Sequence, residues 1–166
     1  MLELWSDQLD LLIRAGTPLI WIRSPEEERV ETLLNKAVTR LGNRRLATWN
    51  FIDGLGGVLN NDGLGARQPM AILQWLQELE SSNPTLLLLK DFHRFCEDPG
   101  VARMLRNLTT RLREQPHTLV LCSGAWSPPE ELEESITLLD LPLPREQEIR
   151  PLLQSIAQAS GTPLDG

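Results

Sequence analysis

The stretch "PLIWIRSPEEERVE" (residues 18–31) predicts a short buried strand that turns directly into a helix. Such turns hold phosphate groups in many α/β proteins, because free N–H groups at a helix N-terminus attract anions. A phosphate loop also needs glycines, a lysine and a hydroxyl group for magnesium. This stretch has no glycine or lysine, and its turn consists of Ser24, Pro25, Glu26, Glu27 and Glu28. An incoming phosphate would be repelled by the three carboxylates.

The same residues also have a purely structural interpretation. Ser24 and Glu27 match the spacing of a helix N-terminal capping box, and Pro25 would then be the first helical residue. Each glutamate complements the positive end of the helix dipole by about 0.3–1 kcal/mol. We therefore expect a well-capped helix start that does not hold phosphate.

Outward from this stretch, the chain alternates predicted strands and amphipathic helices. The strands are expected at residues 19–23, 46–51, 84–91, 117–124 and 136–144. The helices are expected at residues 27–42, from Pro69 onward, and at 99–115, 127–135 and 145–160. Continuous apolar strands separated by helices are typical of a parallel sheet covered on both faces. The pattern predicts an α/β three-layer sandwich with a five-stranded parallel sheet.

The chain divides into three segments. Residues 1–17 predict an N-terminal helix packed on the domain, residues 18–160 the α/β domain, and residues 161–166 a tail or linker. Within the domain, residues 52–68 contain five glycines and predict a long flexible loop. Such a loop is either a plain linker or a mobile segment that binds a partner or contacts another subunit.

Bulk composition limits the class of function. The net charge is −7, from 16 Lys and Arg against 23 Asp and Glu, and this balance argues against nucleic-acid binding, which depends on phosphate neutralisation. No run of 18 apolar residues is present, so we expect no membrane insertion. The two cysteines and an N-terminus without a basic region predict a reducing, cytoplasmic location.

Polar residues lie at or near the carboxyl ends of the predicted strands, where ligands bind in open parallel sheets. These residues are Ser24, Asp53, Asp91 and Ser123. Asp91 is a weak candidate for a catalytic residue, since the adjacent Lys90 would oppose a magnesium ion there. The alternative is that Asp91 caps or pairs locally.

The histidines and cysteines do not form a metal site by spacing. They are His93, Cys96, His117 and Cys122. His117 and Cys122 would lie on one strand, roughly 17 Å apart and on opposite faces. A single zinc ion cannot reach both, because its bonds are about 2.0–2.3 Å long. We expect neither a metal nor a resident cofactor.

A basic stripe is predicted on the helix at residues 99–115. Arg103, Arg106 and Arg113 share one face of this helix. Most such stripes are solvated faces, and others meet an acidic partner. These arginines are therefore the candidate partner-binding residues.

Three stretches carry a resemblance to a known family: "LLIRAGTPLIWIRSPEEERVETLL", "LLLLKDFHRFCEDPGVARMLRNL" and "SITLLDLPLPREQEI". They resemble the N-terminal part of the AAA-type family called hypothetical chloroplast reading frame forty-six, found in cyanobacteria and algal plastids. The resemblance spans nearly the whole chain. It implies a P-loop NTPase fold of AAA type with strand order 5-1-4-3-2, here without a helical lid. In that family a degenerate AAA domain precedes one with intact ATPase motifs, and algal members would lie in the plastid stroma.

The resemblance also assigns positions in a degenerate nucleotide site. Residues 24–31 stand in place of the phosphate loop, Lys90 and Asp91 in place of the Walker B acids, and Ser123 near the sensor position. The usual glycine–lysine–threonine and Asp–Glu pairs are not present.

The function implied is a catalytically silent module that binds a partner protein or its own kind, within an ATPase linked to photosynthesis and carbon dioxide use. ATP and magnesium would act only in the complete family. The alternatives are a receiver-like phosphoacceptor at Asp91 and ATP binding without hydrolysis.

Overall fold

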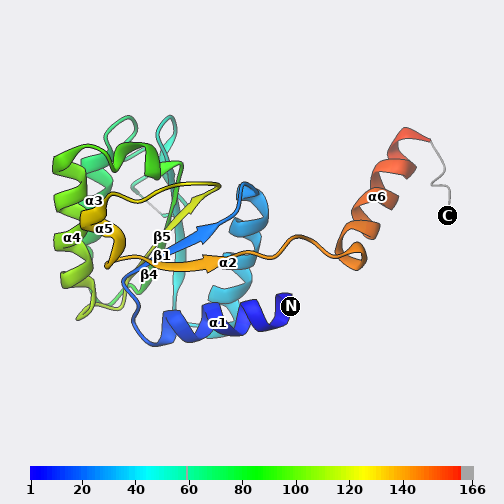
Figure 1. The fold of residues 1–166 in the computed structure, drawn as a ribbon, viewed down its shortest axis with the longest axis horizontal. Helices are drawn as coiled ribbons and strands as arrows, with labels where there is room; N and C mark the ends of the chain where they lie inside the picture. The colour runs from blue at the N-terminus through cyan, green and yellow to red at the C-terminus, as the bar shows by residue number, and fades with distance from the viewer. Residues whose placement is uncertain (59, 162–166) are drawn as a thin grey trace.

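The computed structural model describes residues 1–58 and 60–161 of the chain. A β-sheet lies between two layers of helices, and the last helix, α6, stands away from this sandwich (Figure 1). This arrangement confirms the predicted three-layer α/β class. Of the predicted tail at 161–166, residues 162–166 lie outside the described residues.

The elements alternate along the chain much as predicted. The strands are β1 Leu19–Arg23, β2 Arg45–Asn50, β3 Gly54–Gly56, β4 Thr85–Lys90, β5 Thr118–Ser123 and β6 Thr137–Asp140. The helices are α1 Leu2–Arg14, α2 Glu27–Leu41, α3 Pro69–Glu78, the 3₁₀ helix η1 Phe92–Phe95, α4 Pro99–Leu112, α5 Glu130–Glu133 and α6 Glu146–Ser160. Within the described segments, each helix is too short or too polar to cross a lipid bilayer.

The sheet has the strand order β3-β2-β4-β5-β1-β6. The five strands expected from the sequence lie in the predicted order, 5-1-4-3-2, and their pairings are all parallel. The prediction of a five-stranded, wholly parallel sheet is nevertheless wrong. The short strand β3 adds a sixth position at one edge and pairs antiparallel with β2.

The segment at residues 52–68 contains this sixth strand. The N–H of Leu55 donates to the carbonyl of Leu64 at 2.8 Å, and the N–H of Gly63 donates back to Leu55 at 2.8 Å. The indole Nε1 of Trp49 donates to the carbonyl of Gly65 at 3.0 Å. The expectation of a long flexible loop is therefore wrong for the part of this segment that the structure describes, which excludes residue 59. Gly54 and Gly56 belong to β3, and Gly57, Gly63 and Gly65 adopt positive φ in the bends and turns that follow it.

The core fills both faces of the sheet. Along β1, Leu19 and Trp21 pack in the cluster that includes α3 and α4, whereas Ile20 and Ile22 pack in the cluster that includes α1 and α2. Each fully buried aliphatic side chain of this kind contributes roughly 1.5–3 kcal/mol. This two-sided burial holds the strands in register, so that their carboxyl ends meet along one edge of the sheet.

Substitution of Gly54 tests the ordered state of the 52–68 segment. Gly54 has φ +71°, and an added Cβ would lie 2.5 Å from the carbonyl oxygen of Gly63. Gly16 is a matched control, because its φ is +74° but an added Cβ would have no neighbour within 4 Å. We expect Gly54→Ala to lower the free energy of unfolding, measured in urea, by about 1–3 kcal/mol more than Gly16→Ala does. Equal losses for the two variants would contradict the close packing of this segment.

Candidate functional site

A cleft of about 960 Å³ opens beyond the carboxyl ends of β1, β4 and β5. One wall is the turn between β1 and α2, and another is formed by the first turns of α6. The lining residues are Ser24, Pro25, Glu26, Glu27, Glu28, Arg29, Asp91, Cys122, Ser123, Gly124, Pro144, Glu148, Ile149 and Leu152. The cleft thus brings together six of the seven residues predicted at the degenerate nucleotide site, all except Lys90.

The turn after β1 differs from the predicted capping box. The helix α2 begins at Glu27, its N-cap is Glu26, and no side chain caps it. Ser24 instead continues the strand, because its N–H donates to the carbonyl of Ser123 at 2.9 Å. Its hydroxyl oxygen accepts the N–H of Glu26 at 3.1 Å, which closes a tight local turn through Pro25. The proline therefore precedes the helix and is not its first residue.

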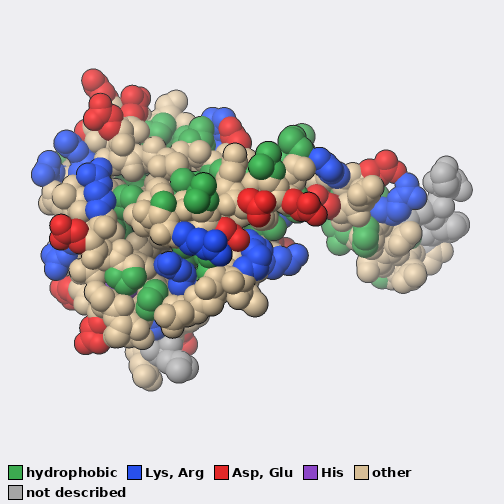
Figure 2. Space-filling model, turned by 90° about the horizontal axis from the view of Figure 1, so that it is seen from below, with side chains coloured by type: hydrophobic (Ala, Val, Ile, Leu, Met, Phe, Trp, Pro, Cys, Tyr) green, Lys and Arg blue, Asp and Glu red, His purple; other side chains and the backbone are tan. Residues whose placement is uncertain are grey.

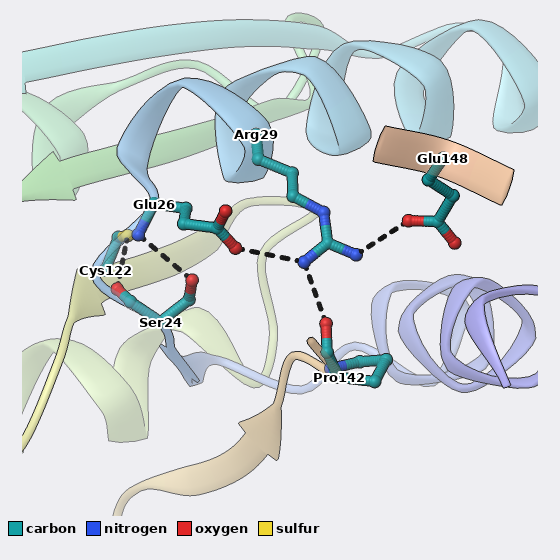
Figure 3. A network of polar contacts seen from close by, with 6 residues as sticks. All are labelled: Ser24, Glu26, Arg29, Cys122, Pro142 and Glu148. Atoms are coloured by element: carbon teal, nitrogen blue, oxygen red, sulfur yellow. Dashed lines mark hydrogen bonds and ion pairs between the residues drawn. The ribbon is translucent and has the colours of Figure 1, made fainter. Parts of the chain in front are cut away.

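Arg29 links three parts of the chain beside the cleft (Figure 3). Its Nη1 donates to Glu26 Oε2 at 3.1 Å and to the carbonyl oxygen of Pro142 at 2.7 Å. Its Nη2 donates to Glu148 Oε2 on α6 at 3.2 Å. The guanidinium charge is thus already balanced by two carboxylates. The sequence analysis did not single out Arg29, and the local signal for its role was the spacing of three from Glu26.

Lys90 does not act on its neighbour Asp91. Its ammonium donates to Glu31 Oε2 at 2.7 Å. Burial lowers the pKa of Lys90, but the hydrogen bond to Glu31 and the attraction of nearby acids raise it by more, so the net pKa is above its ordinary value. Lys90 is therefore charged and hydrogen-bonded to Glu31 on α2, and its opposition to a magnesium ion at Asp91 stays a prediction.

Asp91 is an exposed residue on a strained backbone. Its φ is +57° and its ψ is +18°, a left-handed conformation that is uncommon for residues other than glycine. It stands at the N-cap position of η1, yet its side chain makes no capping hydrogen bond. The alternative that Asp91 serves as a local cap is wrong for this reason. Its carboxylate faces the cleft without a partner among the described residues.

The floor of the cleft is formed by the end of β5. Burial, together with the charges of Glu27 and Asp91, raises the pKa of the Cys122 thiol to about 12. Cys122 is therefore a protonated thiol at neutral pH and a poor nucleophile. Ser123 is 5% exposed, and its hydroxyl makes one long contact, 3.4 Å, with the carbonyl of Gly124.

Other predicted residues lie outside the cleft. Arg103 and Arg106 are exposed on α4 and Arg113 is exposed at its C-cap, and α4 covers the sheet together with α3. Asp53 accepts the amide of Asn50 at 3.0 Å in the turn before β3. These residues therefore belong to other surfaces of the molecule.

The histidines and cysteines are dispersed. His117 accepts the N–H of Thr85 through Nδ1 at 3.2 Å and contacts the carbonyl of Leu79 through Nε2 at 3.2 Å. Burial lowers its pKa, as it does for His93 on η1. In residues 1–58 and 60–161, no three or more His, Cys, Asp or Glu residues are arranged to hold a metal ion.

Solved structures of larger proteins contain this fold. The chain aligns with PCH-2 of C. elegans at a TM-score of 0.61 and 13% identity, over 94% of this chain and 46% of that one. It aligns with a RuvB variant of Thermotoga maritima at a TM-score of 0.60 and 16% identity, over 96% of this chain and 51% of that one. At this level of identity the likeness establishes the AAA-type α/β fold alone.

Sequence comparison places the chain within one branch of that class. Residues 5–141 match the SpoVK-like AAA ATPase, N-terminal domain, and the chain belongs to this family. The uncharacterized AAA domain-containing protein ycf46 of Guillardia theta is 39% identical over 151 residues, and that of Trieres chinensis is 36% identical over 161 residues. These alignments cover 91% and 97% of this chain but only 30% and 32% of the relatives. The resemblance to the chloroplast reading frame forty-six family, inferred from the sequence, is thereby confirmed. The chain spans about a third of the relatives' length.

Removal of Arg29 should release the N-terminal end of α6 from the body. We expect Arg29→Ala to speed hydrogen exchange of the α6 backbone amides by about three- to tenfold, because the contacts to Pro142 and to Glu148 are lost. Arg40→Ala is the control, since Arg40 forms a similar pair with Asp10 on α1. Unchanged exchange in α6 for Arg29→Ala, or an equal effect of Arg40→Ala, would contradict this role.

Proposed function

We propose that this chain is a catalytically silent AAA-like domain that acts by binding another protein or a second copy of itself. The observation that carries the proposal is the charge of the cleft. Glu26, Glu27, Glu28, Asp91 and Glu148 line it, and the one basic residue among its lining residues, Arg29, is already paired with two of them.

The residues of the cleft do not fit a magnesium-bound triphosphate. A triphosphate is held by converging backbone N–H groups and a lysine. Here the N–H of Ser24 donates to Ser123, the N–H of Glu26 donates to the Ser24 hydroxyl, and the nearest lysine, Lys90, is bound to Glu31. Three consecutive glutamates at the helix start add repulsion and already complement the dipole. We therefore derive no ATP turnover for these residues.

Two exposed surfaces support a binding role. The first is the face of α4 with Arg103, Arg106 and Arg113, none of which forms an ion pair with a described residue. The second is the start of the 52–68 segment, where Phe51 and Ile52 are exposed. A basic stripe attracts an acidic partner, and the net charge of −7 favours protein over nucleic acid as that partner.

The role within a longer protein follows from the family. Relatives that continue beyond this region are AAA domain-containing proteins, so this domain would provide contacts beside an active ATPase module. We place it in the cytoplasm, or in the plastid stroma for algal relatives. We retain the link to regulation of photosynthesis and carbon dioxide use as part of this proposal.

The alternative is a receiver-like phosphoacceptor at Asp91, and the exposure of this unpaired carboxylate favours it. Against it, the acids after β1 lie in the turn and in α2, and only Arg145 follows β6 where such a site needs a lysine. Intact mass after incubation with acetyl phosphate separates the two functions, because a labile addition at Asp91 would favour the phosphoacceptor.

The cleft should not respond to nucleotide. We expect Mg-ATP at millimolar concentration to leave the melting temperature of the chain unchanged, measured by differential scanning fluorimetry. A ligand present at 100 times its Kd would add about 2.7 kcal/mol of stability. A rise of several degrees would therefore refute the silent-cleft proposal and favour ATP binding without hydrolysis.

The α4 face can be tested in co-purification from a cyanobacterial extract with the chain as bait. We expect Arg103→Ala, Arg106→Ala and Arg113→Ala, combined in one variant, to reduce recovery of specific partners by about tenfold, because the complementary charge is lost. A variant that combines Arg14→Ala, Lys36→Ala and Arg94→Ala changes the net charge by the same amount at other exposed sites. This control variant should recover the specific partners as well as the wild type does. Equal recovery by the wild type and the α4 variant would exclude this face.

A further inference from the structure

The last helix of the chain presents an apolar side that nothing in the described structure covers. No residue of α6 is buried, and Leu152, Leu153 and Ile156 are 61%, 45% and 56% exposed. An isolated helix of this length gains little stability in water and normally depends on packing of its apolar side. Figure 2 shows hydrophobic side chains among charged ones on the part of the chain that projects from the body. This face is therefore suited to a partner.

The apolar side of α6 continues into the cleft. Ile149 and Leu152 line it from α6, and Pro144 lines it from the segment before that helix. The facing wall is the acidic turn with Glu27 and Glu28. The result is a groove with one apolar wall and one acidic wall, and Figure 2 shows acidic side chains at the neck between the body and α6.

The acidic wall is only partly balanced by positive charge, since Lys90 lies near enough to Glu27 for that carboxylate to raise the lysine pKa but is hydrogen-bonded to Glu31. Arg29 pairs with Glu26 and Glu148, whereas Glu27, Glu28 and Asp91 form no ion pair with residues 1–58 or 60–161. At the floor, Ser24 and Ser123 are nearly buried residues, each 5% exposed. A cationic group is attracted by the carboxylates, whereas a phosphate, and with it nucleic acid or an anionic lipid surface, would be repelled.

We propose that this groove docks a cationic amphipathic helix of a partner protein. Leucine-like side chains of the partner pack on Leu152 and Ile149, and its lysines or arginines meet Glu27, Glu28 and Asp91. Helix-in-groove recognition uses this combination of an apolar anchor and a charged rim. The inference rests on the proposed binding function and names the chemistry of one partner of the cleft.

The probe is a fluorescein-labelled 18-residue helical peptide made of leucine and lysine in an amphipathic pattern. Its binding to the 1–166 chain is followed by fluorescence anisotropy at two salt concentrations. Two matched peptides serve as controls, one with glutamate in place of lysine and one with serine in place of leucine. We expect the leucine–lysine peptide to bind at least about tenfold more tightly than either control, and to weaken as salt screens the charges.

Variants of the chain locate the binding. We expect the combination Glu27→Gln, Glu28→Gln and Asp91→Asn to weaken binding by about tenfold, and Leu152→Ser to do so as well. The matched controls are Glu130→Gln, Glu131→Gln and Glu134→Gln together, on the exposed acidic surface of α5, and Leu11→Ser, on the exposed side of α1. These should leave binding within about twofold of wild type. Circular dichroism establishes that each variant keeps its helix content.

Several outcomes would overturn the inference. An equal loss of peptide binding in the α5 control variant would mean that the peptide is held by general charge attraction. Self-association of the chain alone that depends on Leu152 would mean that a second copy of the chain occupies the groove. Binding to vesicles of anionic lipid would also contradict it. Failure of the peptide to bind, with no response to Mg-ATP, would refute the docking site alone. Displacement of the peptide by Mg-ATP would instead refute the proposed function.

Discussion

Burial of β1, β4 and β5 on both faces is the constraint on which the rest of this structure depends. Leu86, Leu87, Leu88 and Leu89 of β4 are all fully buried, with alternate side chains in opposite helix layers. Such strands have no face for solvent, so they occupy the centre of a parallel sheet. Their carboxyl ends then meet at one edge, and the turns that follow them form the cleft.

The cleft lies where ligands bind in open parallel sheets, but its charges disfavour a phosphate group. A helix N-terminus beside a strand end attracts anions, yet the glutamates at the start of α2 satisfy this dipole from within the chain. Arg29 does not restore positive charge, because Glu26 and Glu148 share its guanidinium group. The charges that line the cleft therefore favour cations over anions, while the apolar core beneath it is independent of them.

Patterns that depend on neighbours along the chain predicted the structure well. The helix predicted at residues 27–42 is observed as α2, with Val30, Leu34 and Ala37 buried and Gly42 as its C-cap residue at φ +64°. The predicted start of α4 at Pro99 is also observed, with Asp98 as its side-chain cap. The predictions that failed were those for which composition or a short motif was compatible with two structures. The glycines in 52–68 suggested a long loop, but Gly54 and Gly56 belong to the edge strand β3.

The amino-acid sequence by itself determined the alternation of strands and helices, the order of the five main strands through its family resemblance, and the acidity of the turn at residues 24–28. Only the tertiary structure decided which charged side chains are paired with one another. Arg29 meets Pro142 and Glu148, which are 113 and 119 residues away, and Lys90 meets Glu31 across 59 residues. Local periodicity depends on adjacent residues, whereas these pairs form only after the sheet has brought distant segments together. For that reason the cleft's unpaired carboxylates, and the uncovered face of α6 beside them, could be recognised only in the folded chain.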